Sequence, residues 1–364
     1  MIDTESLVRP HIQDMPSYIP ILPFEVLSRQ YGLPNDQIIK LDANENPYGA
    51  LPQVSEALAK LSYAHIYPDP ESRELREALA QFHNLPQENI LIGAGADEMI
   101  DLLMRLLIDP GETIIDCPPT FGMYTFDADL NRANVISIPR LPDFSLDFDA
   151  IVEAVETHKP KIIFLATPNN PDGNLPQSSQ IDRLLELPLI VVLDEAYIEF
   201  APKGFSRIKE VPSNDNLVIL RTFSKWAGLA GLRVGYGVLP SQMMPHLWKI
   251  KQPYNISVAA STAALVSLAN LSELHVVGSK IIAERERLYT QLNEIPWLQP
   301  YPSQANFILC KVINKKAIQV KEQLANKGIF IRHFNKPGLE DHIRISVGRA
   351  EHTDILITTL GLME

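Results

Sequence analysis

Short runs of β-branched residues alternate with helical patterns in the middle of the chain, and this alternation is the strongest constraint on its fold. Strands are expected at residues 90–92, 113–116, 134–138, 161–165 and 189–193, with helices at 96–108, 150–158 and 178–187. This order predicts an α/β fold with a mostly parallel sheet that helices cover on both faces. Two more strands, at 217–221 and 233–238, follow without a long helix between them. Part of the sheet is therefore expected to be antiparallel.

The chain has 364 residues, enough for about two domains of roughly 150 residues each. We expect a large domain over residues 44–255. A long helical stretch after Pro253 is expected to lead out of it, so that residues 256–364 form a bridging helix and a small α+β domain. Residues 1–43 are rich in proline and are expected to form an arm that packs against another part of the protein.

The charge and the cysteine count exclude several classes of protein. A net charge of −12 argues against nucleic acid as a partner and gives no basic footprint for a membrane surface. The N-terminus has acids and prolines where a signal peptide needs a basic end and an apolar run, and no apolar stretch is long enough to span a membrane. Cys117 and Cys310 show no disulfide or zinc spacing. We therefore expect a cytoplasmic protein without a metal site.

A lysine among glycines is the first candidate for chemistry. Lys225 follows the strand expected at 217–221 and comes just before Gly228, Gly231, Gly235 and Gly237. Glycines let backbone and ligand approach closely, and a lysine in such a position is suited to bond covalently to a carbonyl group. Taken alone, a lysine of this kind is more often an ordinary loop residue.

Three further signals lie at the ends of expected strands. Asp194 follows the run 189–193, at the end of the strand where open α/β sheets bind ligands. Asn170 lies in a Pro-Asn-Gly turn, and GAGADE at residues 93–98 opens a helix whose free N–H groups suit a phosphate. Each also has an ordinary explanation as a cap or a turn. Together with Lys225 they match pyridoxal 5′-phosphate, which needs an N–H nest, an acid, hydrogen-bond donors and a lysine.

Several motifs now indicate a family: LDANENPYG (41–49), GAGADE (93–98), ATPNNPDG (166–173), VLDEAY (192–197) and RTFSKWAGLAGLRVGYG (221–237). They resemble the fold-type I aminotransferases and, within these, the histidinol-phosphate aminotransferase family, over about residues 18–349. The resemblance implies conversion of L-histidinol phosphate and 2-oxoglutarate to imidazole acetol phosphate and L-glutamate in histidine biosynthesis. It also implies a homodimer with shared active sites.

The resemblance assigns three residues to catalysis. Lys225 would bond to the cofactor aldehyde and move the proton of the substrate Cα, Asp194 would pair with the ring nitrogen, and Tyr197 would donate to the phenolic oxygen. The other residues that the resemblance assigns to the cofactor are Ala96, Asp97, Ser224 and Arg233 around the phosphate, Asn170 at the phenolic oxygen, Phe121 stacked on the ring, and Tyr67 reaching the phosphate from the neighbouring subunit.

The resemblance also implies a set of substrate-binding residues. Arg332 and Arg344 lie in two expected strands of the small domain, where exposed ladder arginines are equally common. Guanidinium groups bind both phosphates and carboxylates bidentately, so one arginine pair would serve both substrates. Asn44 belongs to the same set, and Tyr18 would be supplied by the neighbouring subunit.

Other functions share these motifs. An aromatic amino-acid aminotransferase and a pyridoxal-phosphate-dependent decarboxylase of a phosphorylated amino acid both remain open alternatives. A pyridoxal-binding regulatory module is disfavoured, because such modules need a DNA-binding domain and this acidic chain has no room for one before Asn44.

Overall fold

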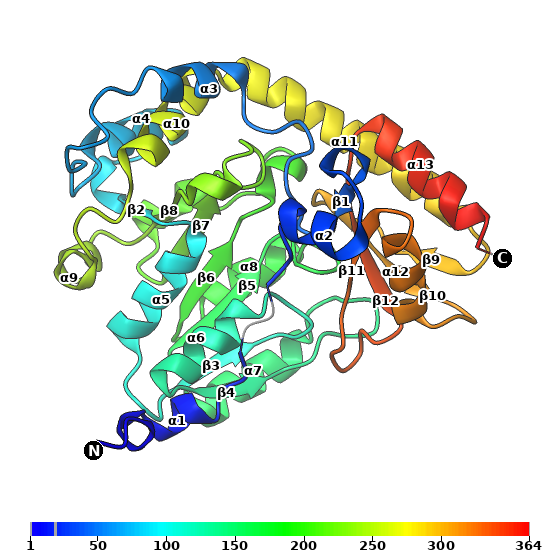
Figure 1. Ribbon diagram of the computed structural model, residues 1–364. Coiled ribbons are helices and arrows are strands. Elements are labelled where there is room, and N and C mark those ends of the chain that lie inside the picture. Colours follow the sequence, from blue (N-terminus) through cyan, green and yellow to red (C-terminus); the bar gives the residue numbers. More distant parts are fainter. Residues whose placement is uncertain (1, 18–19, 364) are drawn as a thin grey trace.

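The larger part of the protein is built on a seven-stranded sheet. The computed structural model describes residues 2–17 and 20–363, and Figure 1 shows two α/β parts joined by a long helix. The strand order in the larger sheet is β2-β8-β7-β6-β5-β3-β4. Its strands are β2 (Ile90–Gly93), β3 (Thr113–Asp116), β4 (Asn134–Ser137), β5 (Ile162–Ala166), β6 (Ile190–Asp194), β7 (Leu217–Thr222) and β8 (Gly235–Val238).

Strand β8 runs antiparallel to both of its neighbours, whereas the other pairings in this sheet are parallel. No long helix lies between β7 and β8, as the sequence indicated, since the 12 residues that join them hold only the short helix Ala230–Leu232. Strand β7 is also preceded only by short 3₁₀ helices and still pairs in parallel with β6, so the lack of a long helix does not by itself set the direction of a strand.

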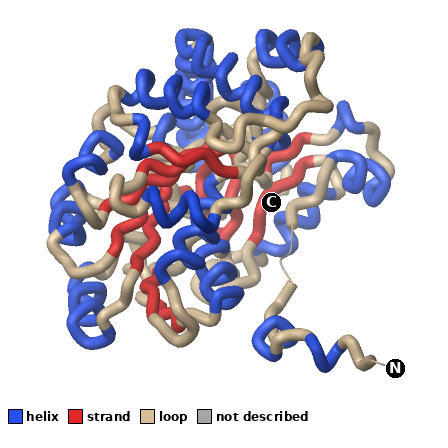
Figure 2. The backbone as a smooth tube through the Cα atoms, turned by 90° about the vertical axis from the view of Figure 1, so that its left-hand side faces the viewer, coloured by secondary structure: helices blue, strands red, loops and turns tan. Residues whose placement is uncertain are grey.

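Helices cover both faces of this sheet, which confirms the predicted α/β class. Alternate strand residues enter different apolar clusters: Ile114 and Phe164 face one side, Ile115 and Ile163 the other. Figure 2 shows helices on both sides of the strands. One face is covered by α5 (Ala96–Leu107), α6 (Met123–Asn131) and α9 (Met244–Ile250), the other by α4 (Arg73–His83), α7 (Phe148–His158), α8 (Ser178–Leu185) and α10 (Val258–Ala269).

The smaller part is a five-stranded sheet with the order β1-β11-β12-β10-β9. Its strands are β1 (Ile39–Leu41), β9 (Leu298–Pro300), β10 (Phe307–Val312), β11 (Ile329–His333) and β12 (His342–Ser346), with helices α2 (Phe24–Tyr31), α12 (Ala317–Ala325) and α13 (Ala350–Gly361). The remaining helices are α1 (Pro10–Gln13), α3 (Pro52–Ala59), α11 (Leu271–Asn293) and the short 3₁₀ helices Glu5–Leu7, Asn35–Gln37, Gln87–Asn89, Ile198–Phe200, Ile208–Ser213 and Ala230–Leu232.

The N-terminal segment is more closely integrated than an arm. Strand β1 pairs in parallel with β11, and Leu27 of α2 is buried with Phe330 of the same strand. Residues 24–41 therefore belong structurally to the smaller part. The division of the chain at residues 43 and 255 stays a prediction.

The long helical stretch expected after Pro253 is two helices. Helix α10 ends at Ala269, and α11 continues at an angle of 84°. At the break, the Asn270 Nδ2 donates to the carbonyl of Val266 (2.7 Å). Such side-chain bonds compete with helix continuation, which explains why apolar periodicity alone missed the bend.

In the described chain, no single helix is long and apolar enough to cross a membrane. The bent pair α10 and α11 passes the same test of length and composition only when the two are taken together.

Candidate active site

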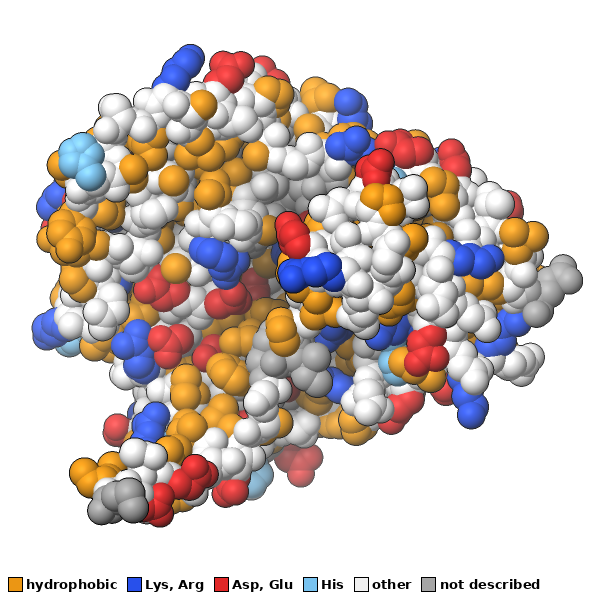
Figure 3. Space-filling view, viewed as in Figure 1, with side chains coloured by type: hydrophobic (Ala, Val, Ile, Leu, Met, Phe, Trp, Pro, Cys, Tyr) orange, Lys and Arg blue, Asp and Glu red, His pale blue; other side chains and the backbone are white. Residues whose placement is uncertain are grey.

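The largest cavity that contains predicted site residues lies between the two parts and has a volume of about 890 Å³. In the space-filling view, a hollow opens where the parts meet, with basic and acidic side chains beside it (Figure 3). The predicted site residues that line the cavity are Asn44, Phe121, Asn170, Tyr197, Lys225, Arg332 and Arg344.

Lys225 lies in the turn that follows β7. Its Nζ donates to the carbonyl oxygen of Ala43 (3.1 Å), and burial, aided by the positive charge of Arg344, lowers its pKa to about 8. The turn depends on Gly228, whose φ of +70° is left-handed and whose added Cβ would lie 2.3 Å from the carbonyl oxygen of Gly49. Lys225 is thus an amine that loses its proton more readily than an ordinary lysine, as a nucleophile or base requires.

Asp194 is the last residue of β6, and its carboxylate is fixed from two sides. The Tyr124 hydroxyl donates to Oδ2 (2.8 Å), and the backbone N–H of Ala196 donates to Oδ1 (3.1 Å). Burial raises the pKa of Asp194 to about 6 in spite of these bonds. A cationic partner such as a protonated ring nitrogen would offset that cost. Tyr124, which is fully buried, was not among the residues that the sequence pointed to.

A second buried carboxyl, Asp127 on α6, makes a test of these electrostatics possible. It is 4% exposed, its Oδ2 accepts no hydrogen bond from any described residue, and burial followed by the charges of Asp101 and Asp97 raises its pKa to about 7. The folded protein therefore holds this proton between about pH 4 and pH 7, where the unfolded chain releases it. Ionisation of Asp127 then lowers the free energy of unfolding as the pH rises through this window.

We expect Asp127→Asn to become more stable relative to wild type as the pH rises from 5 to 7. The difference in unfolding free energy should grow by up to about 1.4 kcal/mol per pH unit, because the amide cannot ionise. Chemical denaturation of both proteins at pH 5, 6 and 7 measures it. A difference that does not change with pH would show that Asp127 ionises normally in the folded state.

Asn44 and Tyr197 form a hydrogen-bonded pair at the cavity. Asn44 has a left-handed φ of 54°, and its Nδ2 donates to the Tyr197 hydroxyl (3.1 Å). The Ser346 hydroxyl fixes the amide by donating to Asn44 Oδ1 (2.8 Å). Because Asn44 supplies a donor to the hydroxyl oxygen, the Tyr197 O–H is available to donate to a ligand.

The two predicted arginines are neighbours in the smaller sheet, since Arg332 of β11 and Arg344 of β12 are register partners. Arg344 is held by donating from Nη1 to Asn170 Oδ1 (2.5 Å) and from Nη2 to the carbonyl of Asp42 (2.7 Å). Arg332 lies over the ring of Phe334, 5.7 Å from its centroid. Both line the cavity, so the structure places two guanidinium groups beside Lys225 in one hollow.

The expected phosphate nest lies at the same edge of the larger sheet. Gly93, Gly235 and Thr222 occupy one row of the ladder. Helix α5 begins at Ala96, and its first N–H groups have no acceptor within the helix. An added Cβ at Gly235 would lie 2.8 Å from the nitrogen of Ala96, so the glycine keeps this approach open.

Side chains complete the nest. Arg233 forms an ion pair with Asp97 (Nη2 to Oδ2, 2.8 Å), and both are about half exposed. Ser224 is buried, and its Oγ accepts a hydrogen bond from Thr222 Oγ1 (2.8 Å). This donor set, with Lys225 and the buried carboxyl of Asp194, fits the phosphate, aldehyde and ring nitrogen of pyridoxal 5′-phosphate.

The lining of the cavity does not include Tyr67, Asp194 or the nest residues Ala96, Asp97, Ser224 and Arg233. Tyr67 is 79% exposed and packs on Tyr254, with ring centroids 4.7 Å apart. Tyr18 lies outside the described residues. Phe121 does line the cavity, and its ring contacts Tyr124 edge-on at 5.6 Å.

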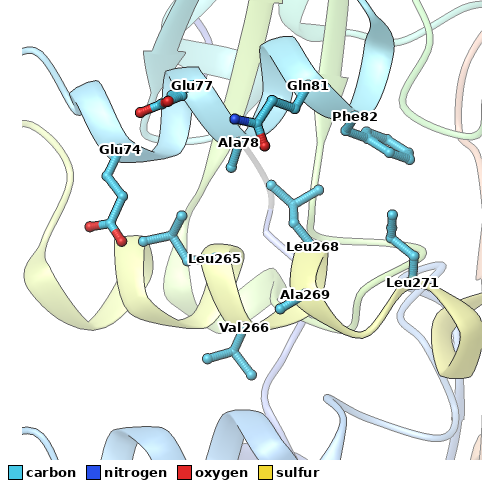
Figure 4. Close-up of a pocket in the computed structure, with 10 residues that line it drawn as sticks. All are labelled: Glu74, Glu77, Ala78, Gln81, Phe82, Leu265, Val266, Leu268, Ala269 and Leu271. Carbon is cyan, nitrogen blue, oxygen red and sulfur yellow. The ribbon is translucent and has the colours of Figure 1, made fainter.

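A different hollow, of about 690 Å³, lies between α4 and α10 (Figure 4). Its lining residues are Glu74, Glu77, Ala78, Gln81, Phe82, Leu265, Val266, Leu268, Ala269 and Leu271. They include neither a nucleophile nor a basic group, so this hollow does not compete with the cavity at Lys225 as a site for chemistry.

Comparisons with known proteins show which family the chain belongs to. A family model described as aminotransferase class I and II matches residues 36–360. Histidinol-phosphate aminotransferase 1, chloroplastic, from Arabidopsis thaliana is 55% identical over 357 residues, which is 98% of this chain and 85% of the plant protein. Histidinol-phosphate aminotransferase from Roseiflexus castenholzii is 49% identical, with 97% of both chains covered.

A solved structure agrees as well. Histidinol-phosphate aminotransferase from Sinorhizobium meliloti, in complex with pyridoxal-5′-phosphate, matches with a TM-score of 0.89 at 28% identity and covers 99% of both chains. The fold is thus that of a class I and II aminotransferase. Within that class, the chain belongs to the histidinol-phosphate aminotransferase family.

Proposed function

We propose that this protein uses pyridoxal 5′-phosphate to transfer the amino group of L-histidinol phosphate to 2-oxoglutarate, giving imidazole acetol phosphate and L-glutamate in histidine biosynthesis. The observation that carries the proposal is that a lysine of lowered pKa shares one cavity with two adjacent arginines. The names of relatives 49% and 55% identical over almost the whole chain support it.

The cofactor would be held by residues at the carboxyl edge of the larger sheet. The N–H groups of Ala96 and Asp97, with Ser224 and Arg233, would take the phosphate, and Asp194 the ring nitrogen. When bound, the cofactor supplies an aldehyde for the substrate amine and an electron sink for the carbanion at Cα.

The protein's own groups would position the substrate and move its proton. Lys225, with a pKa near 8, is suited to take the proton from the substrate Cα and would deliver it to the C4′ atom of the cofactor. Arg332 and Arg344 would bind the phosphate of one substrate and a carboxylate of the other through bidentate hydrogen bonds. Tyr197 would donate its hydroxyl proton to the phenolic oxygen of the cofactor.

A comparison of amine donors tests the proposal against its alternatives. The absorbance of the cofactor is followed during single half-reactions with L-histidinol phosphate, L-tyrosine, L-phenylalanine and L-glutamate. We expect L-histidinol phosphate and L-glutamate to react with the highest kcat/KM. Preference for tyrosine or phenylalanine would indicate an aromatic aminotransferase, and release of carbon dioxide from a phosphorylated amino acid would indicate a decarboxylase.

The exposed aromatic surface around Tyr67 supports a homodimer with shared sites. Tyr63, Ile66, Tyr67 and Tyr254 are all large apolar residues that are about half exposed or more. Grouped surfaces of this kind often mark protein–protein contacts. Tyr67 is exposed and does not line the cavity of its own chain, so we propose that it completes the site of a second copy, together with Tyr18.

Mixing two inactive variants tests the shared site. Lys225→Ala and the double variant Tyr18→Phe, Tyr67→Phe are each expected to be strongly impaired. A random mixture of the two should regain up to about a quarter of wild-type activity, because about half of its pairs are heterodimers and one of the two sites in each heterodimer is intact. Each homodimer, refolded alone, is the control. Heterodimers that form without any recovery would show that each site is built from one chain.

We further propose a cytoplasmic location. Cys117 and Cys310 are both free and buried, as is usual in a reducing compartment. The plant relatives carry the word chloroplastic in their names.

A further inference from the structure

The wall of the cavity contains a single acid. Asp116, the last residue of β3, is the one Asp or Glu among the described residues that line it. The lysines and arginines of the same wall are Arg140, Lys225, Lys311, Arg332, Lys336 and Arg344. Basic groups suit the phosphate and carboxylates of the proposed substrates. They do not explain an acid in the same wall.

Asp116 lacks a partner for one of its oxygen atoms. The residue is 4% exposed, and Oδ1 accepts no hydrogen bond from any residue in 2–17 or 20–363. No lysine or arginine of that part of the chain lies within ion-pair distance of its carboxylate. Leaving a buried acceptor unpaired costs free energy, so such an atom at a cavity wall is an unsatisfied site for a donor.

Arg140 is the cation with the largest effect on Asp116, and two of its nitrogens donate to backbone carbonyls. Arg140 donates from Nε to the carbonyl of Cys117 (3.2 Å) and from Nη1 to the carbonyl of Phe144 (3.0 Å). Arg140 and Lys336 reduce the effect of burial on Asp116, yet its pKa is still raised to about 6. The backbone N–H of Cys117 also favours the charged form, so at neutral pH the carboxylate is mostly ionised while its Oδ1 has no partner among the described residues.

A ligand that satisfies Asp116 must carry an N–H or O–H that the reaction does not use. In L-histidinol phosphate the amine would react with the cofactor aldehyde and the phosphate is an anion, which leaves the imidazole N–H. Aromatic side chains that line the same cavity, Phe121, Phe144 and Tyr301, can flank such a ring. This reasoning rests on the proposed function.

We propose that Asp116 accepts a hydrogen bond from the imidazole N–H of the substrate and thereby selects an imidazole over a phenyl ring. A site that hydrogen-bonds a substrate N–H rejects an analogue without it, because the buried acceptor is then left unpaired. Asp116 is thus a specificity-determining residue at the ring end of the substrate. Lys225 and the arginines serve the amine and the phosphate.

The test compares three amine donors on the holoenzyme. L-histidinol phosphate and L-phenylalaninol phosphate differ only in the ring, and L-glutamate has no ring. Wild type should prefer the imidazole compound to the phenyl compound by about tenfold to a hundredfold in kcat/KM, the factor expected when one buried acceptor is left unpaired. Asp116→Leu should lose at least about tenfold with L-histidinol phosphate, keep L-glutamate within about twofold, and react as well or better with L-phenylalaninol phosphate.

Binding supplies a readout that does not depend on turnover. Calorimetric titration of the aminated holoenzyme, which cannot convert an amine, should show the same reversal of preference between the two ring compounds. Asp127→Asn is the matched control, since Asp127 is also 4% exposed with an unpaired oxygen but does not line the cavity. It should leave the ratio of the two ring compounds unchanged.

The outcomes separate the inference from the proposed function. Equal losses on all three donors would make Asp116 a structural residue and overturn the inference. If Asp116→Leu does not fold, Asp116→Asn replaces it, with a loss confined to L-histidinol phosphate expected and a uniform loss overturning the idea. Wild type that reacts with L-glutamate but not with L-histidinol phosphate would overturn the proposed function, and the inference with it.

Discussion

Lys225→Ala is expected to lower the rate of amino transfer by about four orders of magnitude or more, because no other amine occupies the turn after β7 to move the proton of the substrate Cα. Thermal stability and cofactor affinity should change much less, since the N–H nest at α5 and Asp194 lie on other elements. Single-turnover rates with L-glutamate measure the loss, and dialysis against known cofactor concentrations measures the affinity.

Lys225→Arg is the matched control for this variant. It keeps a positive charge at the same position, but a guanidinium does not release its proton near neutral pH. The arginine variant should therefore be about as inactive as the alanine variant. Turnover near the wild-type level in either one would remove Lys225 from its role.

Asp194→Asn is expected to slow proton loss from the substrate Cα by several orders of magnitude while the protein still folds. The carboxylate of Asp194 would keep a proton on the ring nitrogen of the bound cofactor, whereas a neutral amide would favour the unprotonated nitrogen. The measurement is the rate of hydrogen exchange at the Cα of L-glutamate in deuterated water. A loss of less than about tenfold, or roughly 1.4 kcal/mol of barrier, would contradict this role.

Tyr124→Phe separates the charge of Asp194 from its positioning. This variant removes the hydroxyl that donates to Asp194 Oδ2 but keeps the carboxylate. A single hydrogen bond to a charged group contributes about 1.5 to 3 kcal/mol, so the expected loss is about tenfold to a hundredfold. It should thus be clearly smaller than that of Asp194→Asn.

The sequence predicted those parts of the fold and site that depend on neighbouring residues. Short apolar runs of three to six residues identified strands of the larger sheet. Asp194 was found because it directly follows such a run, and Lys225 because it lies shortly after another, among glycines. An antiparallel part of the sheet was indicated because no long helix separates β7 from β8.

The parts that sequence reasoning missed depend on contacts between distant positions. Tyr124 and Asp194 are 70 residues apart, and Asn44 and Ser346 are 302 apart, so no local pattern reports their hydrogen bonds. The pairing of β1 with β11 is equally remote. Asp116 is different: it ends an apolar strand just as Asp194 does, and the rule that found Asp194 applied to it as well.

A nitrogen tracer shows directly whether the amino group of L-histidinol phosphate is transferred to 2-oxoglutarate. Holoenzyme is incubated with L-histidinol phosphate carrying ¹⁵N only in its amino group and with unlabelled 2-oxoglutarate, and the products are analysed by mass spectrometry. We expect the label to appear in L-glutamate in a one-to-one ratio with imidazole acetol phosphate, and we expect Lys225→Ala to form neither product. Label that remains in L-histidinol phosphate, or that is released as ammonia without labelled glutamate, would contradict it.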